Sequence, residues 1–150
     1  MFNPRLFAMK IVFTPYEVDS RDYIFDSYVE TMKHHIDNIW GWDETWQQVN
    51  FSHSLDKYLT FTLNLAGQKL GYIQLKHKSD YTYLSMIVLT AKYQSKGYGV
   101  QILKKIQSLK PNLPIKLRCF KVNKSAYNFY LQNGFTTVKS NKEFYTLLRK

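Results

Sequence analysis

The feature that most constrains the fold is a strand, a glycine-containing loop and a helix that follow one another between residues 83 and 110. The run from Tyr83 to Thr90 is apolar and β-branched, and it has the length of a strand. After the loop, apolar residues recur at helical spacing at Ile102, Leu103, Ile106 and Leu109. The loop reads Gln94-Ser95-Lys96-Gly97-Tyr98-Gly99. Because the first N–H groups of a helix lack internal partners and the helix dipole is positive there, this arrangement predicts a site for an anion.

The glycine spacing excludes two common phosphate loops. A Walker P-loop has four residues between its glycines and then Gly-Lys-Ser/Thr, which this sequence lacks. A dinucleotide-binding fingerprint needs a third Gly or Ala where Ile102 stands. The loop reads instead as Gln-x-x-Gly-x-Gly, and it resembles the pyrophosphate loop of the GNAT superfamily, the acyl-CoA-dependent N-acyltransferases.

A second motif, over residues 123–135, resembles the other GNAT signature. The sequence reads Asn-Lys-Ser-Ala-Tyr-Asn-Phe-Tyr-Leu-Gln-Asn-Gly-Phe, and it fills every specified position of Asn-x-x-Ala-x-x-Phe-Tyr-x-x-x-Gly-Phe. Two departures accompany the match: Ala91 stands where the family usually has Pro, and Gln94-Ser95-Lys96 replaces its common Arg-Gly-Lys. Two motifs in the right order are specific for the superfamily and say little about the acceptor.

The remaining patterns predict an order of elements that matches the GNAT fold, β-α-α-β-β-β-α-β-α-β-β. We expect strands over 9–14, 57–65, 70–77, 83–90, 115–120, 135–138 and 144–148. We expect helices over 20–39, from 43 to about 51, from the loop to about 110, and over 125–133. The fold class is therefore α/β (α+β): a mixed, mostly antiparallel sheet of six to seven strands with four helices, splayed at the acetyl-CoA site. Residues 9–150 are expected to form a single domain, with residues 1–8 an N-terminal extension.

Two local expectations accompany this interpretation. Asp19 is expected to cap the first helix, with Asp22 as its capping-box partner. Residues 57–65 alternate with period two, which predicts a half-buried strand with Leu63 and Leu65 on one face and Thr60 and Thr62 on the other.

The resemblance implies a coenzyme site, residue by residue. Gln94 would open the loop, and the pyrophosphate of acetyl-CoA would bind the backbone amides of Ser95, Lys96, Gly97, Tyr98 and Gly99. Strand residues Ile87 to Leu89 would splay from the strand that starts near Pro114 and pair with the pantetheine arm. The Leu89 N–H would contact the thioester oxygen. Asn123 would contact the pantetheine or hold the splayed strands, and Tyr130 would protonate the departing thiolate.

The resemblance implies that the acceptor site lies around the segment between the first two helices. Its residues are Tyr28, Trp40, Trp42, Asp43, Glu44 and Tyr83. An aromatic cage with carboxylates favours a cationic amine. Because the amine must lose a proton to attack, a base is needed, and Glu44 and Asp43 are the best candidates, with Tyr83 and Ser85 as alternatives through water. Simpler roles stay open: Asp43 as a helix cap, Glu44 as a partner of the helix dipole, and the tryptophans as core residues.

Charge is divided unevenly along the chain. Residues 1–60 contain 5 Lys/Arg and 9 Asp/Glu, whereas residues 61–150 contain 16 and 2, and the whole chain has a net charge of +10. A basic part around a phosphate loop suits coenzyme A, and an acidic part suits a cationic amine. The alternatives are a basic surface that serves solubility and one that binds nucleic acid.

Other features narrow the class of protein. The four histidines have no metal-binding spacing, and Cys119 is expected in the core, so neither a metal nor a cysteine nucleophile is expected. Apolar runs are too short to span a membrane and no signal-peptide pattern is seen, so a cytoplasmic protein is expected.

We therefore expect an N-acetyltransferase that transfers an acetyl group from acetyl-CoA to a primary amine of a small molecule or protein, by direct attack in a ternary complex. One alternative is a non-catalytic acyl-CoA-binding protein in which Tyr130 is structural, and a basic nucleic-acid-binding domain ranks last. The expected partners are acetyl-CoA and an amine, without nucleic acid or a membrane. A homodimer is a class expectation.

Overall fold

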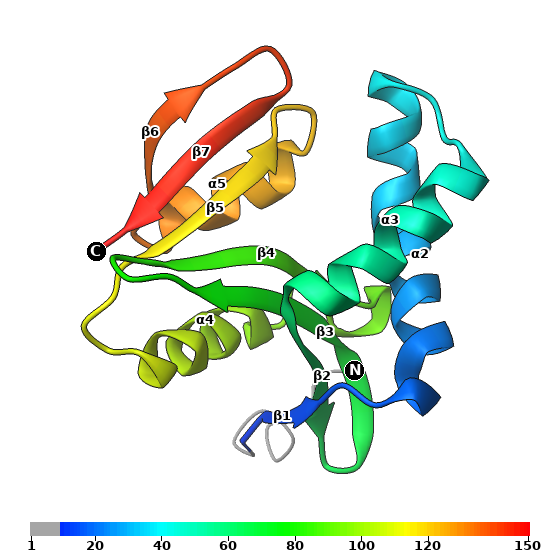
Figure 1. Ribbon diagram of the computed structural model, residues 1–150. Coiled ribbons are helices and arrows are strands. Elements are labelled where there is room, and N and C mark those ends of the chain that lie inside the picture. The colour runs from blue at the N-terminus through cyan, green and yellow to red at the C-terminus, as the bar shows by residue number, and fades with distance from the viewer. Residues whose placement is uncertain (1–9) are drawn as a thin grey trace.

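A mixed sheet with helices on both faces makes up the computed structural model, which describes residues 10–150 (Figure 1). Its strands are β1 (Val12–Pro15), β2 (Leu59–Leu65), β3 (Gln68–His77), β4 (Thr82–Leu89), β5 (Ile115–Phe120), β6 (Thr136–Ser140) and β7 (Phe144–Arg149). Its helices are α2 (Arg21–Ile39), α3 (Glu44–Lys57), α4 (Tyr98–Leu109) and α5 (Lys124–Gln132), with short 3-10 turns η1 (Val18–Ser20) and η2 (Ala91–Tyr93). The order of elements is the expected one. Residues 1–8 and Met9 lie outside the described part.

The sheet has seven strands in the order β1-β2-β3-β4-β5-β7-β6. Every neighbouring pair is antiparallel except β4 and β5, which are parallel. The mixed, mostly antiparallel sheet with four helices in the described chain confirms the predicted fold class. No helix in the described part of the chain is long and apolar enough to cross a membrane.

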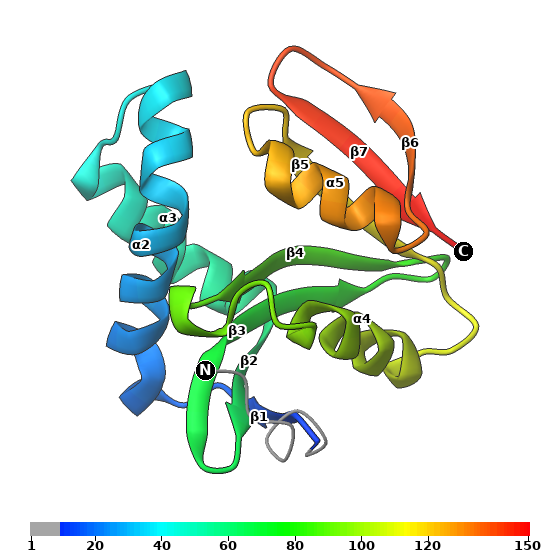
Figure 2. The same cartoon turned by 180° about the vertical axis from the view of Figure 1, so that it is seen from behind.

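Two hydrophobic clusters cover the two faces of this sheet. The larger lies beneath α4 and α5 and includes Leu63, Ile73, Leu84, Ile102 and Leu117. The smaller lies beneath α2 and α3 and includes Ile24, Phe25, Phe51, Tyr72 and Val88. Figure 2, seen from behind, shows α4 and α5 on the side opposite α3. Alternation along β3 sends Ile73 and Leu75 to the first cluster and Tyr72 to the second, because successive side chains point to opposite faces.

Three local predictions were wrong. Helix α3 continues to Lys57, about two turns beyond the expected end near Phe51. Asp19 does not cap the first helix: it lies inside η1, and Ser20 precedes α2 without a side-chain cap. Strand β2 is not half-buried, because Thr60 and Thr62 are 6% and 2% exposed under the helical layer. Its polar face therefore packs against protein, which the alternation by itself did not reveal.

Candidate active site

The glycine loop leads from β4 into α4. Ser95 has φ of 60° and Gly97 has φ of 83°, so two left-handed residues alternate with Lys96 between them. Alternating backbone conformations of this kind aim consecutive N–H groups into one concavity. The residue that precedes α4 is Gly97, which has no side-chain oxygen to offer to the first turn. The loop thus presents backbone donors where the helix dipole favours an anion.

Gln94 fixes the start of this loop. Its side-chain Nε2 donates to the carbonyl oxygen of Leu89 at 2.7 Å, so the loop is tied to the last residue of β4. The predicted position of Gln94 at the opening of the loop therefore has a structural reason.

Gly99 also lies where α4 packs against α5. A Cβ at this position would lie 2.8 Å from Cζ and 3.1 Å from Cε1 of the Phe129 ring on α5. The glycine therefore allows α5 to pack against α4. It links the two sequence motifs, since Phe129 belongs to the second.

Strands β4 and β5 separate after a short paired stretch. They pair only where Thr82, Tyr83 and Leu84 face Ile115, Lys116 and Leu117. The rest of β4, including Ile87 and Leu89, has no partner in β5 (Figures 1 and 2). The predicted splay is therefore present.

The register of β3 with β4 shows which backbone groups face that splay. The Thr90 N–H donates to the Leu70 carbonyl at 2.9 Å, in line with the pairs Leu89–Gly71 and Ile87–Ile73. Hydrogen-bonded and non-hydrogen-bonded pairs alternate in an antiparallel ladder. Leu89 and Ile87 are therefore in non-hydrogen-bonded pairs, and their backbone groups point away from β3 towards β5. Gln94 occupies the Leu89 carbonyl, which leaves the Leu89 N–H directed into the splay.

The second motif forms α5, which contains Tyr130 and packs against β5. Asn123 caps the helix, since its Oδ1 accepts from the Ala126 N–H at 3.2 Å. Tyr130 is buried between the rings of Phe129 and Phe135, each with its centroid 5.4 Å away. Burial, and to a lesser degree the nearby Cys119 thiol, raises the pKa of Tyr130 above its ordinary value.

The Tyr130 hydroxyl makes no hydrogen bond within the described residues. It is also not among the fully enclosed, unpartnered side-chain oxygens, which are those of Tyr23, Thr62 and Tyr72. The Tyr130 side chain is 8% exposed, and its raised pKa means that the hydroxyl retains its proton at neutral pH. Such a group can donate a hydrogen bond to an anionic sulfur.

The carboxylates between α2 and α3 already have partners. Asp43 Oδ1 accepts from the Trp46 N–H at 2.9 Å and caps α3. Glu44 Oε2 accepts from Trp42 Nε1 at 2.8 Å. The Asp43 contact is the helix cap that the sequence left open, and Glu44 lies in the first turn of α3, where it can also be a partner of the helix dipole.

The three tryptophans contact different parts of the molecule. Trp40, which follows α2, reaches across to Phe120 and Phe144, with ring centroids 5.7 and 6.0 Å away. Trp42 lies 5.9 Å from the Tyr28 ring, and Trp46 is 58% exposed. The structure therefore does not gather them into one cage around Asp43 and Glu44.

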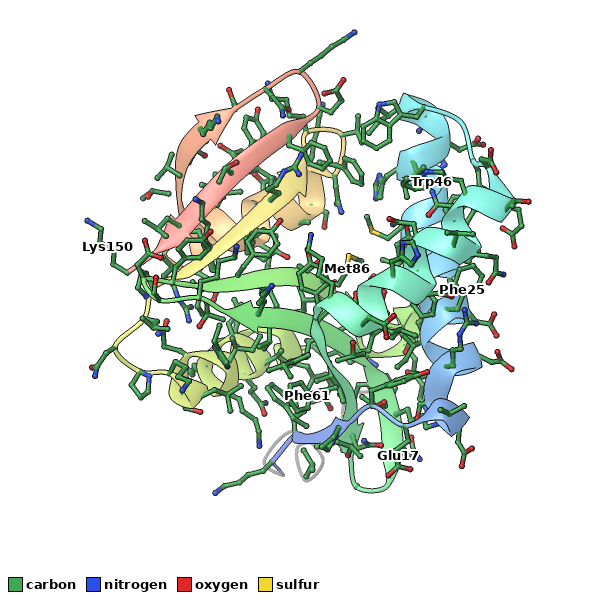
Figure 3. The ribbon with its side chains drawn as sticks, in the orientation of Figure 1. Glu17, Phe25, Trp46, Phe61, Met86 and Lys150 are labelled. Carbon is green, nitrogen blue, oxygen red and sulfur yellow. The ribbon has the colours of Figure 1, made fainter. Side chains whose placement is uncertain are left out.

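Tyr28 and Tyr83 adjoin a cavity of about 250 Å³ between α3 and the sheet. Its lining comes from α2, α3, β3, β4 and the residue before β2: Tyr28, Asn50, Phe51, His53, Ser54, Lys57, Tyr58, Gln74, Ser85 and Met86. Tyr28 donates to Gln47 Oε1 at 2.7 Å, and burial raises its pKa to about 12. Tyr83 lies behind the lining residue Tyr58, with ring centroids 6.3 Å apart. Figure 3 shows Met86 where β4 passes beneath α3.

Most residues of this cavity were missed from the sequence. His53, Ser54 and Lys57 belong to the part of α3 that was not predicted to be helical. Gln74 is 2% exposed and donates to Ser54 Oγ and Thr60 Oγ1, each at 3.1 Å. A larger hollow of about 690 Å³, lined by Lys104, Arg149 and neighbouring residues, lies at the other end of α4 from the glycine loop.

Solved structures of acetyltransferases share this fold. The chain superposes on the PaiA N-acetyltransferase of Thermoplasma acidophilum in complex with coenzyme A, with a TM-score of 0.72, 19% identity and coverage of 95% of this chain and 99% of that one. It also resembles an acetyltransferase from Thermus thermophilus, with a TM-score of 0.76, 16% identity and coverage of 94% and 97%. The ribosomal-protein-S18-alanine N-acetyltransferase of Escherichia coli gives a TM-score of 0.65, 16% identity and coverage of 93% and 92%. At these identities the likeness establishes the shared fold.

The family follows from the sequence itself. The model of the acetyltransferase (GNAT) domain matches residues 26–148, and the chain belongs to this family. No curated protein matches the sequence at a significant level.

Proposed function

We propose that this protein is an N-acetyltransferase that transfers an acetyl group from acetyl-CoA to a primary amine by direct attack in a ternary complex. The observation that carries the proposal is the open edge of β4, where the Leu89 backbone N–H points into the splay beside the glycine loop. A pantetheine arm could pair with this edge as a further strand does. The backbone amides of Ser95, Lys96, Gly97, Tyr98 and Gly99 would bind the pyrophosphate at the start of α4.

The reaction would proceed at the thioester carbonyl. The neutral amine nitrogen attacks the carbonyl carbon, and the Leu89 N–H stabilises the negative charge that develops on the oxygen. The carbon–sulfur bond then breaks, and Tyr130 donates a hydrogen bond to the departing sulfur. Since burial raises the pKa of Tyr130, the hydroxyl is suited to hydrogen-bond donation more than to complete proton transfer.

The assignment of the base stays a proposal. Glu44 can accept a proton only by exchanging its hydrogen bond from Trp42 for one from the acceptor or a bridging water. Asp43 would have to give up the cap of α3. We therefore retain Glu44 as the proposed base, with water-mediated transfer through Ser85, which lines the cavity, as the alternative. A cytoplasmic location and a homodimer stay predictions.

Thermal unfolding with and without acetyl-CoA tests the coenzyme site. A ligand at 100 times its Kd stabilises the folded state by about 2.7 kcal/mol, which for a chain of this size is a rise in Tm of roughly 5–10 °C. Adenosine triphosphate and a DNA duplex are the polyanion controls. A rise specific to acetyl-CoA supports the proposal, whereas no rise, or an equal rise with DNA, contradicts it and favours nucleic-acid binding.

Turnover separates the enzyme from a non-catalytic acyl-CoA-binding protein. Release of the free thiol of coenzyme A is followed with a panel of primary amines. Amine-dependent thiol release supports transfer. Binding of acetyl-CoA without release for any amine would favour the non-catalytic alternative.

A further inference from the structure

The cavity beneath α3 has no carboxylate in its lining. Neutral polar groups come from Tyr28, Asn50, Ser54, Gln74 and Ser85, and the basic groups come from Lys57 and His53. Asp56 neighbours Lys57 on α3 but does not line the cavity. The volume of about 250 Å³ corresponds to roughly eight water molecules, which suits a small molecule.

Two cations flank the pair of tyrosines at the edge of this cavity. Lys57 Nζ lies 5.3 Å from the ring centroid of Tyr58, whose ring adjoins that of Tyr83. Tyr83 pairs with Lys116 across β4 and β5, so Arg118, two residues further along β5, lies on the same face of the sheet as Tyr83. Its positive charge partly offsets the rise that burial causes in the pKa of Tyr83. Neither cation forms an ion pair with another residue in the described part of the chain.

Arg118 is also held in a defined orientation. Alternation along β5 places Leu117 and Cys119 in the core and Arg118 on the opposite, exposed face. Its guanidinium carbon lies 3.9 Å from the centroid of the Phe144 ring, so the planar group stacks on that ring. A guanidinium in this position keeps its N–H edges available, and those edges match a carboxylate or phosphate in two parallel hydrogen bonds.

These charges oppose the expectation of a purely cationic acceptor. That expectation rested on the carboxylates of Asp43 and Glu44. In the structure they accept hydrogen bonds from Trp46 and Trp42 at the corner between α2 and α3. A diamine would bring a second positive charge next to Lys57 and Arg118. An amine with a negative group would bring the opposite charge, which both cations favour.

We propose that the acceptor is a small primary amine bearing a carboxylate or phosphate, and that Arg118 and Lys57 bind this anionic group at the edge of the α3 cavity. The proposal rests on the acetyl transfer proposed above and names the acceptor class for that site. The amine end of the acceptor lies towards Ser85 on β4, beyond which β4 leaves β5. Both kinds of acceptor, with a carboxylate or with a phosphate, have an anionic oxygen group a few bonds from a primary amine.

Matched acceptors test this proposal. Acetylation is measured as kcat/KM for tyrosine against tyramine and for phosphoethanolamine against ethanolamine, with 1,4-diaminobutane as the dication. We expect the anionic member of at least one pair to be preferred by about 10-fold or more, as expected for a hydrogen-bonded charge pair. The pair that shows the preference identifies the carboxylate or the phosphate as the group recognised.

Variants of the cations then locate the recognition. In Arg118→Gln and Lys57→Gln we expect the preference for the anionic acceptor to fall by roughly 5- to 10-fold, whereas kcat/KM for the matched amine without the anionic group changes little. Lys139→Gln is the matched control, because Lys139 is exposed on the outermost strand β6. The ratio of two acceptors is internal to each variant, so it does not depend on how much of the variant is folded.

The outcomes separate this inference from the proposed function. Preference for tyramine, ethanolamine or 1,4-diaminobutane overturns the acceptor class, while acetyl transfer itself stands. An anionic preference that persists unchanged in both glutamine variants overturns the assignment of Arg118 and Lys57. Absence of an acetyl-CoA-specific rise in Tm overturns the proposed function and, with it, this inference.

Discussion

Substitution of Gly99 by alanine tests why the loop needs a glycine at its second position. If the glycine serves helix packing, the added Cβ must collide with Phe129, at 2.8 Å from Cζ and 3.1 Å from Cε1. Both distances are below ordinary van der Waals contact. The Phe129 ring is partly buried and meets the Tyr130 ring edge-on, with ring centroids 5.4 Å apart, so its movement is restricted on that side.

The magnitude follows from two opposing effects. Overpacking a well-packed site costs typically about 1–3 kcal/mol. Replacing a helical glycine by alanine contributes up to about 1 kcal/mol in the other direction, and less near a helix end such as the start of α4. The free energy of unfolding of Gly99→Ala should therefore fall by about 1–2 kcal/mol, which corresponds to a fall in Tm of about 3–6 °C.

A double-mutant cycle with Phe129→Leu measures the contact itself. Leucine removes the two ring atoms that the new Cβ would meet, so Gly99→Ala should cost much less in this background. Chemical denaturation of the four proteins should give a coupling energy of about 1 kcal/mol. The packing argument is refuted if Gly99→Ala unfolds like the parent and loses acetyl-CoA affinity instead, with no rescue by Phe129→Leu. That result would assign the glycine to close approach of the pyrophosphate.

Three further predictions concern single side chains. Tyr130→Phe should reduce acetyl transfer about 10-fold or more with nearly unchanged acetyl-CoA affinity, measured by thiol release and calorimetry; unchanged turnover would remove Tyr130 from the leaving-group role. Tyr72→Phe should stabilise the protein by about 1 kcal/mol in chemical denaturation, because it deletes a fully buried hydroxyl without a partner; destabilisation by a similar amount would show that the hydroxyl is satisfied. Asn123→Ala should lower stability by about 1 kcal/mol through loss of the cap on Ala126, with Asn123→Ser largely preserving it; equal stability of the two variants would contradict the capping role.

The parts of the fold that the sequence predicted are those with a strong local pattern. The strand at Tyr83 to Thr90, the helix after Gly97 and the cap at Asn123 all occur as expected, because side-chain periodicity and backbone capping act over a few residues. The end of α3 was missed because Ser52, His53 and Ser54 interrupt the apolar pattern. In the structure Ser54 serves the cavity by accepting from Gln74.

The residues of the candidate site also fall into those that a local pattern predicts and those that it does not. Gln94, Ser95 and Gly97 could be placed from a motif whose geometry is local. Arg118 and Lys57 could not, because they lie on β5 and α3, whose places are set by the pairing of β4 with β5 and the packing of α3 on the sheet. Asp43 and Glu44 drew attention by composition, and their hydrogen-bond partners lie within three residues. Composition shows that these carboxylates are present, whereas the structure shows that both already accept hydrogen bonds.

The short contact between β4 and β5 has a consequence for how the molecule opens. Three residue pairs join the half made of β1 to β4 to the half made of β5 to β7, and the Trp40 ring against Phe120 and Phe144 bridges them a second time. The two halves also share the larger hydrophobic cluster beneath α4 and α5, so it is the backbone pairing of the sheet that is short between them. Amide hydrogens of Ile87 and Leu89 should exchange with solvent faster than those of β3, since an isolated edge opens without breaking the rest of the ladder. An extended ligand bound along β4 would supply the missing backbone hydrogen-bond partners, and it would then slow amide exchange in both halves of the sheet together.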